Sequence, residues 1–450
     1  MPLSLLYLYL MLITFKNHIK TNLAILQDAK LIVAISGGID SVVLAYLCNE
    51  LNFNFALAHC NFNLRGEESN ADQDFVLDLA ERLNAEVYVQ NFDTQAHADE
   101  YKKSIQMAAR ALRYNWFDEL AAQFNFDYIL TAHHADDNLE TFLINFTRGT
   151  GLNGLTGIPM INESVVRPLL PFSREEIELY AKQKGIKWRE DSSNASRKYL
   201  RNKLRHEVVP ILKEINPNLL DSFKNTLDHL NDTADIVEEH LNSITINTIS
   251  TINDNGIYYK ISEFKKVNNP KAYLFEMFKN YGFTEWNDVL DLLDAQSGKQ
   301  VLSNSYRLIK HREHLILTEL KSDTLESVIL HEDQMQKGNV ETPIGKFRFQ
   351  NVEKIEKGMS NEIYIDKDKL HFPLELRPWK EGDFFFPLGM KGKKKLSKYL
   401  KDEKLSLVEK ENTWLLTSNN EVVWVVAKRG DNRFKVNSKT NNILKIELKK

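Results

Sequence analysis

The sequence predicts an N-terminal α/β domain in which helices cover both faces of a doubly wound parallel sheet. Two observations carry this prediction. Short β-rich runs alternate with helical segments from residue 31 to about residue 170, and a glycine-rich loop separates the first run from the first helix. A third observation, the loss of this alternation after about residue 205, predicts further domains of another kind. A chain of 450 residues is expected to form two or three domains.

The elements of the first domain follow in order. Five β-rich runs are expected as strands: 31–36, 53–60, 86–92, 128–134 and 164–170. Four segments between them have helical spacing of apolar residues and are expected as helices: 41–51, 69–84, 104–125 and 137–147. Because parallel sheets of this kind bind ligands at the carboxyl ends of their strands, chemistry is expected in the loops that follow the strands.

The rest of the chain changes character twice. Helical patterns begin at about residue 205, with Pro217 near a helix start, and continue over 268–295, while 298–318 has the pattern of hairpin strands. A charged, loop-rich stretch over 321–345 precedes a β-rich end. We therefore expect five regions: an N-terminal extension and lead-in helix (1–30), the α/β domain (31–215), a mainly helical domain (216–325), a linker region (326–372) and a small α+β domain (373–450).

The composition excludes several classes of protein. With 43% hydrophobic and 27% charged residues and a net charge of −4, the chain is a typical globular protein rather than a uniformly basic nucleic-acid binder. Its two cysteines, Cys48 and Cys60, form no C-x-x-C pair, which disfavours disulfides, cysteine zinc sites and iron–sulfur clusters and fits a reducing cytoplasm. The apolar stretch 2–13 is too short to span a bilayer and lacks the flanks of a signal peptide, so we expect no membrane association and interpret 1–10 as an upstream extension before Met11.

The segment S-G-G-I-D-S, residues 36–41, follows the first strand and opens the first helix. Its glycines allow a tight turn and close approach of the backbone to a ligand, and free N–H groups at a helix start attract anions. The Walker lysine and the G-x-G-x-x-G pattern are both absent from it. Its composition alone leaves two interpretations open: a phosphate-binding loop, or a glycine turn in which Asp40 and Ser41 cap the helix.

A second polar cluster follows the fourth strand. His133, one of the adjacent acids Asp136 and Asp137, and Glu140 share one face at the start of a helix. Paired carboxylates suit Mg²⁺ or an ammonium group. An acidic first turn that complements the helix dipole is the alternative, and it explains one acid but not the whole face.

Basic side chains near the same sheet edge are candidates for binding phosphate or carboxylate. Arg110 and Arg113 lie three residues apart on one helix face, where a solvated pair is the simpler interpretation. Two further groups are candidates: His59, Asn61 and Arg65 after the second strand, and Arg201, Lys203 and Arg205 at the end of segment 188–205. A structural histidine and a basic helix face are the respective alternatives.

The order of these motifs resembles that of the tRNA(Ile)-lysidine synthetase family, which belongs to the PP-loop ATP-pyrophosphatases with an adenine nucleotide alpha-hydrolase-like fold. Over about 31–215 the resemblance rests on S-G-G-x-D-S, H-x-N-x-x-L-R-G-x-E-S, A-R-x-x-R-Y, H-H-x-D-D-x-x-E-T, R-P-L-L, W-x-x-D-x-S-N and R-N-x-L-R. It returns over 375–436. Phe62 departs from the family pattern, since many members carry a second histidine at that position, and it is assigned no role.

The resemblance implies an enzyme that uses ATP to ligate L-lysine to C2 of the wobble cytidine in the CAU anticodon of tRNA(Ile). An adenylated intermediate, release of AMP and pyrophosphate, and a switch of the tRNA from methionine to isoleucine identity are implied with it. The implied ATP-binding residues are Ser36, Gly37, Gly38, Ile39, Asp40 and Ser41, with Asp40 near Mg²⁺. The implied catalytic or substrate-binding residues are Asp137, Asp136, Glu140, His133, Arg110, Arg113, Arg65 and Arg205. A homodimer is one assembly consistent with this interpretation.

The C-terminal segment 391–404 carries seven lysines and two acids, a local basic patch on an acidic chain. A solvated surface explains it as an isolated feature, whereas the resemblance favours RNA binding by Lys393, Lys394, Lys395 and Lys398. Three other functions compete. An amidating synthetase would need an ammonia source, a sulfur-transferring tRNA enzyme would need a C-x-x-C motif, and a non-catalytic RNA binder would have no need of an intact S-G-G-x-D-S loop with the D-D-x-x-E face.

Overall fold

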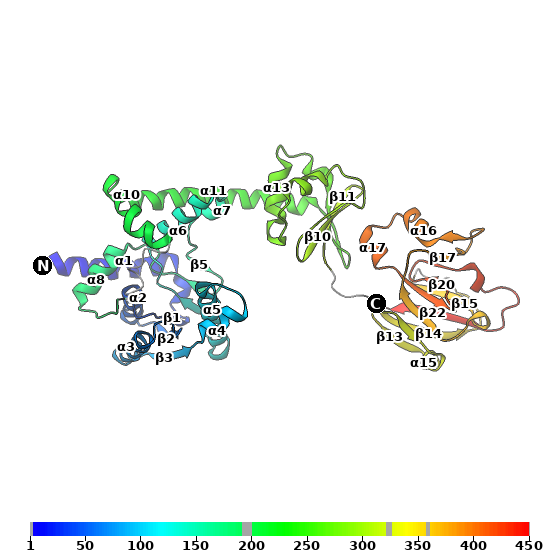
Figure 1. The fold of residues 1–450 in the computed structure, drawn as a ribbon, viewed down its shortest axis with the longest axis horizontal. Helices are drawn as coiled ribbons and strands as arrows, with labels where there is room; N and C mark the ends of the chain where they lie inside the picture. The colour runs from blue at the N-terminus through cyan, green and yellow to red at the C-terminus, as the bar shows by residue number, and fades with distance from the viewer. Residues whose placement is uncertain (1–2, 191–199, 321–325, 357–360, 450) are drawn as a thin grey trace. The chain divides into compact units, whose positions relative to one another are not determined.

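The structure is a computed structural model that describes residues 3–190, 200–320, 326–356 and 361–449. It divides into two compact units, Met1–Val237 and Glu238–Lys450. Figure 1 shows both units as ribbons and labels many of their helices and strands.

The first unit is built on a six-stranded sheet in the order β3-β2-β1-β4-β6-β5. Its strands are β1 (Lys30–Ala34), β2 (Asn54–Asn61), β3 (Glu86–Asn91), β4 (Tyr128–Leu130), β5 (Ile161–Asn162) and β6 (Val165–Val166). All neighbouring pairs are parallel except β5 and β6. The chain moves outward from β1 to β2 and β3 and then returns to the other side of β1 with β4, so the predicted doubly wound sheet is confirmed.

Alternating side chains of the strands supply two apolar layers. Leu31 and Val33 of β1 pack on one face against α1 (Leu3–Asn22), α2 (Ile39–Glu50), α3 (Glu67–Leu83) and α8 (Arg174–Lys184). Ile32 faces the opposite layer, where Trp116, Phe117 and Leu120 of α5 (Ile105–Phe124) are buried. Both faces of the sheet are therefore covered, as the apolar runs of a parallel sheet require.

The helices near the sheet edge begin at recognisable caps. Ser173 and Glu176 form a capping box at the start of α8, and the Ser104 hydroxyl accepts from the Met107 amide at the start of α5. The remaining helices of this part are η1 (Ala24–Leu26), α4 (Thr94–Glu100), α6 (Ala135–Arg148) and α7 (Leu152–Leu155). β4 and β6 are shorter than expected, because the chain leaves the sheet after Leu130 and after Val166.

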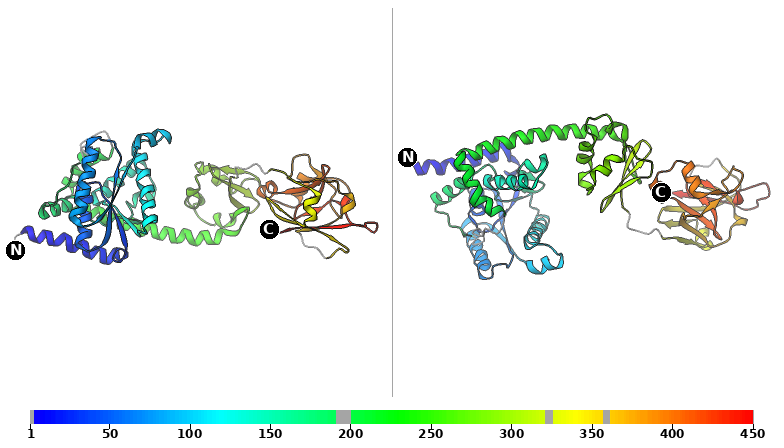
Figure 2. Two further views of the ribbon diagram at one scale, coloured as in Figure 1. Left: turned by 90° about the horizontal axis from the view of Figure 1, so that it is seen from below. Right: turned by 45° about the horizontal axis from the view of Figure 1, so that its top comes forward.

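A helical segment follows the sheet. It comprises α9 (Leu200–Lys203), the π-helical turn η3 (Leu204–Val208), α10 (Val209–Ile215) and α11 (Leu219–Thr248). α11 is one continuous helix of 30 residues, visible in both views of Figure 2, and the boundary between the two units falls within it. The helix predicted near Pro217 is therefore present and starts two residues later, at Leu219.

The second unit begins with a small α+β region over 249–319. Its sheet has five antiparallel strands in the order β7-β8-β11-β10-β9: β7 (Ile249–Asn253), β8 (Gly256–Lys260), β9 (Gln300–Leu302), β10 (Tyr306–His311) and β11 (His314–Glu319). The accompanying helices are α12 (Ile261–Phe264), α13 (Pro270–Phe278), η4 (Lys279–Tyr281) and α14 (Trp286–Asp291). The expected hairpin is β10–β11, and the sheet makes this region less helical than we expected.

The end of the chain packs two sheets around one core. One sheet has the order β12-β16-β19-β20-β21 and the other β13-β14-β22-β15, with a separate pair β17-β18. The strands are β12 (Val328–Leu330), β13 (Asn339–Thr342), β14 (Gly345–Val352), β15 (Glu362–Asp366), β16 (Leu374–Pro378), β17 (Phe384–Phe385), β18 (Lys394–Lys395), β19 (Trp414–Ser418), β20 (Glu421–Val425), β21 (Arg429–Gly430) and β22 (Ile443–Lys449). The helices are α15 (Glu332–Gln336), η5 (Lys367–Lys369), α16 (Leu396–Asp402), α17 (Leu407–Glu411) and η6 (Asn432–Phe434).

Residues 326–372, which we expected to form a linker region, instead contribute four strands to this domain. β12 pairs with β16, and β14 and β15 flank the last strand, β22. Phe347, Phe349 and Ile365 lie in the same buried cluster as Trp424. The segment has the charged composition of a linker because strands with one solvent-facing side alternate polar and apolar residues.

The N-terminal helix α1 packs against the sheet with Met11, Phe15 and Ile19. Within the part of the chain that the structure describes, no helix has both the length and the apolarity needed to cross a membrane.

Candidate functional site

The candidate site lies where the strand order of the parallel sheet reverses. β1 and β4 are neighbours at this point, and the chain leaves their carboxyl ends toward α2 and α6. A cavity of about 650 Å³ opens there. It is the crevice in which doubly wound sheets bind their ligands.

The loop between β1 and α2 is held by its own serines. The Ser36 amide and hydroxyl lie 3.2 Å and 3.1 Å from the Ser41 hydroxyl, which donates to the Gly38 carbonyl at 3.0 Å. Gly37 has φ +88°, a left-handed conformation that favours glycine. These hydrogen bonds hold the turn in one conformation. The first backbone N–H groups of α2 have no acceptor within the helix and remain available to a ligand. Ser36, Asp40 and Ser41 line the cavity.

The loop after β4 brings acids to the same cavity. His134, which is 3% exposed, precedes α6 and forms a capping box with Asp137, whose carboxylate accepts from the His134 amide at 3.2 Å. His133 and Asp137 line the cavity, whereas Asp136 and Glu140 do not. The shared helix face predicted for the acids exists, but only part of it opens onto the cavity.

Basic residues that come later in the chain neutralise these acids. Lys213 lies 2.7 Å from Asp136, whose other oxygen accepts from the Arg174 amide at 2.8 Å. Arg205, in the π-helical turn η3, donates to Glu140 at 2.6 Å and to Asp137 at 3.0 Å. Arg201 lies 3.5 Å from Glu140. Each acid of the cluster is therefore paired, and Asp137 is the paired acid that also faces the cavity.

The surroundings shift the pKa values of this cluster in different directions. Burial lowers the pKa of His133 to about 4, although Asp137 acts in the opposite sense. Burial raises the pKa of Glu140, despite the hydrogen bond from Arg205. Burial opposes ionisation of Asp136 as well, but the Arg174 amide and Lys213 outweigh it and hold the Asp136 pKa below its usual value. His133 is therefore neutral near pH 7.

Asp40 connects the glycine loop to this network. One oxygen of its carboxylate pairs with the Arg174 guanidinium, and the other lies 3.9 Å from His134 Nε2. That second oxygen, Oδ1, is buried and has no hydrogen-bond partner among the described residues. An unpartnered carboxylate oxygen beside the glycine turn of residues 36–41 is chemically suited to Mg²⁺, which takes one or two protein carboxylates together with phosphate oxygens.

The second strand and α3 supply another charged group beside the loop. Asp72 of α3 pairs with Arg65 at 2.8 Å and with Arg189, whose amide donates to the Gly37 carbonyl at 2.9 Å. Arg65 and Asp72 line the cavity. The chain thus places two guanidinium groups beside the turn of residues 36–41.

Residues of β2 and α5 form another part of the cavity wall. His59 donates to the Ile35 carbonyl through Nδ1 at 2.9 Å, while its Nε2 is buried with no partner among the described residues. Arg113 lines the cavity and stacks over Phe62, 5.3 Å from the ring centre. Arg110 lies over Tyr114 and is not part of the lining.

Four residues near the site were not singled out from the sequence: Asp72, His134, Arg174 and Arg189. Arg174 had a detectable signal, because the S-x-x-E capping box at 173–176 marks a helix that starts near the sheet edge. The signal for Arg189 lay in segment 188–205, of which residues 191–199 are outside the described part of the structure.

The lysines predicted to bind tRNA lie in the second unit. Lys394 pairs with Asp402 at 2.9 Å, and Lys393 lies over Phe384, 3.4 Å from the ring centre. Lys395 and Lys398 are exposed, and no ion pair is found for either within the described residues. Phe385 and Tyr399 are buried in a small core, so neither ring is exposed for stacking on a base.

Comparison with known proteins gives matches along most of the chain. Residues 11–212 match the model of the PP-loop domain, 252–320 that of the TilS substrate binding domain and 374–448 that of the TilS substrate C-terminal domain. A tRNA(Ile)-lysidine synthase of Parabacteroides distasonis is 39% identical, with 96% of this chain and 99% of that protein covered. Relatives of the same name from Bacteroides thetaiotaomicron and Clostridium perfringens are 37% and 31% identical; the matches cover 95% and 96% of this chain and 97% and 98% of those proteins.

Proposed function

This chain belongs to the tRNA(Ile)-lysidine synthase family of ATP-dependent ligases, and from that membership we propose that it ligates L-lysine to C2 of the wobble cytidine in the CAU anticodon of tRNA(Ile). The product, lysidine, switches the tRNA from methionine to isoleucine identity. One observation carries the proposal: the S-G-G-I-D-S turn and a carboxylate of the D-D-x-x-E face line the same cavity at the reversal point of the sheet.

The first step activates a poor electrophile. The C2 carbonyl oxygen of cytidine attacks the α-phosphate of ATP, pyrophosphate leaves, and the oxygen becomes part of an AMP ester. Backbone amides at the start of α2 and the hydroxyls of Ser36 and Ser41 hold the departing pyrophosphate. The guanidinium groups of Arg65 and Arg189, beside the same turn, add positive charge where negative charge accumulates.

A Mg²⁺ ion would be held by the free oxygen of Asp40 together with phosphate oxygens of ATP. When bound, the ion neutralises phosphate charge. Arg174 binds the other Asp40 oxygen and so fixes the orientation of this carboxylate in the wall of the cavity.

The second step transfers lysine. The ε-amine of lysine attacks C2, and the AMP ester leaves with the former carbonyl oxygen. The ammonium group of free lysine must first lose a proton, and Asp137 is the acid that faces the cavity to accept it. Asp136 acts on Asp137 through His134, and Glu140 acts on it through Arg205. Arg113, which also lines the cavity, receives the lysine carboxylate.

The direct test is incubation of the chain with labelled lysine, ATP and tRNA(Ile) that carries the CAU anticodon, followed by nucleoside analysis. We expect a labelled lysidine nucleoside and pyrophosphate release that requires both tRNA and lysine. Pyrophosphate release with a small acid and ammonia in place of tRNA would indicate an amidating synthetase instead. Binding of tRNA without any ATP turnover would indicate a non-catalytic RNA binder.

A further inference from the structure

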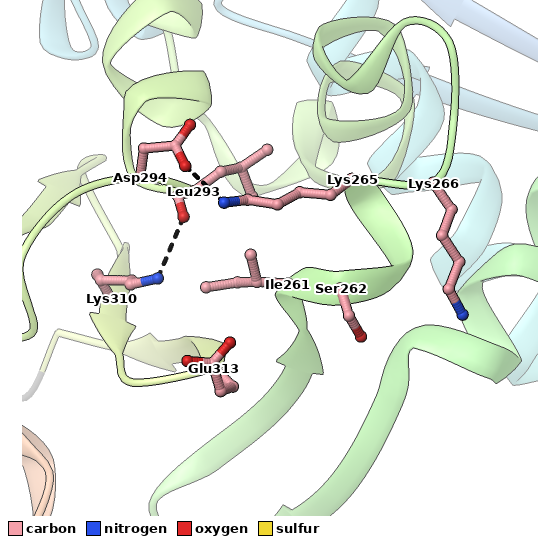
Figure 3. Close-up of a pocket in the computed structure, with 8 residues that line it drawn as sticks. All are labelled: Ile261, Ser262, Lys265, Lys266, Leu293, Asp294, Lys310 and Glu313. Carbon is pink, nitrogen blue, oxygen red and sulfur yellow. Dashed lines mark hydrogen bonds and ion pairs between the residues drawn. The ribbon is translucent and has the colours of Figure 1, made fainter.

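The α+β region of the second unit contains a pocket that no step of the proposed reaction uses. It has a volume of about 410 Å³ and is lined by Ile261, Ser262, Lys265, Lys266, Leu293, Asp294, Lys310 and Glu313. Figure 3 shows the ammonium groups of Lys265 and Lys310 converging beneath Leu293 and Asp294, while Lys266 points away from them. Three lysines and two acids give the lining a net positive charge.

Lys310 occupies a position where an apolar residue is expected. It lies on β10 two residues after Leu308, so both side chains point to the face that carries the buried cluster of this region. Its partner across the sheet is Leu315, which is fully buried. Lys310 is itself only 8% exposed. A lysine buried at a core-facing strand position is an informative exception, because lysine is almost never fully buried without a partner.

The surroundings of Lys310 satisfy its charge incompletely. Its ammonium group donates to the Leu293 carbonyl at 3.1 Å, and among the described residues it forms no ion pair with a carboxylate. The lining holds two acids, and one of them, Asp294, pairs with Lys265. Burial lowers the Lys310 pKa, because removing the ammonium group from water disfavours its charged form. An ammonium group has three donors, so donors remain for an incoming anion.

Positive charge gathers at this end of the region. Segments 260–266, 293–299 and 310–313 are joined by backbone hydrogen bonds from Ile261 to Glu313, from Gly298 to Lys310 and from Lys310 to Lys299. Over 252–320 the chain has nine basic and nine acidic residues, not counting histidine, and these three short segments carry six of the basic ones but only three of the acids. Lys260, Lys265, Lys266, Lys299 and Arg312 are exposed. The region has no net charge, but its basic residues are concentrated around the pocket.

We infer that this pocket binds a phosphate group of the tRNA backbone, with Lys265 and Lys310 as the contacting residues and the exposed basic residues around it as secondary contacts. The inference rests on the proposed function for the identity of the partner. An anion in the pocket supplies the acceptor that Lys310 lacks, and exposed lysines around a concave site attract a polyanion at long range. Ser262 adds a hydroxyl donor at the rim.

The test measures binding of tRNA(Ile) to the full chain and to single variants at several salt concentrations. Lys310→Met and Lys265→Ala are each expected to weaken binding roughly tenfold at 0.1 M salt, the range expected for loss of one hydrogen bond between charged groups. Each is also expected to reduce the slope of log Kd against log salt by about one, because one phosphate contact is lost. Lys271→Ala is the matched control, since Lys271 is an exposed lysine of the same region that bonds Asn287 and does not line the pocket.

A footprint of the unmodified chain gives a second readout that does not depend on the folding of any variant. Lysines are labelled with an amine-reactive reagent with and without tRNA and are identified by mass spectrometry. Protection of Lys265 and Lys310 with Lys271 unprotected supports the inference. Equal labelling of all three, or variants that bind like Lys271→Ala with an unchanged salt slope, overturns it. If the wild-type chain still forms lysidine in that case, the proposed function stands and only the pocket assignment fails.

Discussion

The two carboxylate oxygens of Asp40 have different surroundings: Arg174 binds one, and the other is buried and unpartnered among the described residues. We expect Asp40→Ala to lower kcat/KM for lysidine formation by at least about a thousandfold, since a charged group at the phosphates is lost. Arg174→Ala, which leaves Asp40 present but unheld, is expected to cost about tenfold to a hundredfold and to raise the Mg²⁺ concentration needed for half-maximal rate. Lys182→Ala is the control on the same helix. A Mg²⁺ requirement unchanged in Arg174→Ala would remove Arg174 from this role.

His133 carries the expected pH dependence at the residue scale. Its pKa of about 4 in the folded chain lies below the ordinary value of 6.5, so the unfolded chain binds the proton more tightly. Above pH 6.5 His133 is neutral in both states and does not destabilise the folded chain. As the pH falls from 6.5 toward 4, the unfolded chain takes up the proton first, and the free energy of unfolding decreases. Between pH 7 and pH 5 we expect a loss of about 2 kcal/mol in urea unfolding of the first unit, and His133→Gln should reduce that loss. An equal loss in the variant would assign it to other groups.

Sequence reasoning at this scale succeeds where partners are local. The turn 36–41 and the acids of α6 are short sequence patterns. Each can be placed at the sheet edge because it follows a predicted strand and lies at the start of a helix. The partners of Asp40 and Asp72 are Arg174 and Arg189, which lie 134 and 117 residues away along the chain. No spacing rule identifies such pairs, because an ion pair between distant segments depends on how whole helices pack.

At the scale of elements, the ion pairs of Glu140 join α6 to α9 and η3. Glu140 is 1% exposed and is paired with Arg205 and Arg201. Removing Arg205 leaves a buried carboxylate with reduced compensation, and we expect Arg205→Ala to lower the free energy of unfolding by about 3 kcal/mol. Arg205→Ala combined with Glu140→Gln should recover at least half of that loss, since the buried charge is gone. A double variant no more stable than Arg205→Ala would show that the loss of stability does not come from the unpaired charge of Glu140.

The elements also show why part of the fold escaped prediction. The predicted strands 31–36, 53–60 and 86–92 match β1, β2 and β3 to within one or two residues. Apolar runs mark β1 and β2, whose middle residues are buried, whereas valine and tyrosine mark the edge strand β3. β13, β14 and β15 alternate charged and apolar residues, so the segment 326–372 has the composition of a loop. Its strands are stabilised by pairing with β22, about a hundred residues later for β14, and long-range pairing of this kind leaves no local signal.

At the scale of the whole molecule, a chain with a net charge of −4 must bind a polyanion, which requires local positive charge. We propose that exposed lysines of the C-terminal domain supply part of it. Lys395 and Lys398 are exposed without an ion pair in the described structure. We expect Lys395→Ala with Lys398→Ala to weaken tRNA binding several-fold and to reduce the salt slope by one to two. Lys428→Ala with Lys439→Ala is the matched control, because both residues are exposed lysines of the same domain. Identical salt slopes for the two double variants would contradict an RNA contact at 395–398.

The most direct measurement follows one oxygen atom through the reaction. The central claim is that the turn at 36–41 holds the departing pyrophosphate while the cytidine C2 oxygen takes AMP and then leaves with it. With tRNA(Ile) that carries ¹⁸O at C2 of the wobble cytidine, mass spectrometry of the products should find one ¹⁸O in AMP and none in the lysidine base. Lysidine formation with unlabelled AMP would contradict the claim.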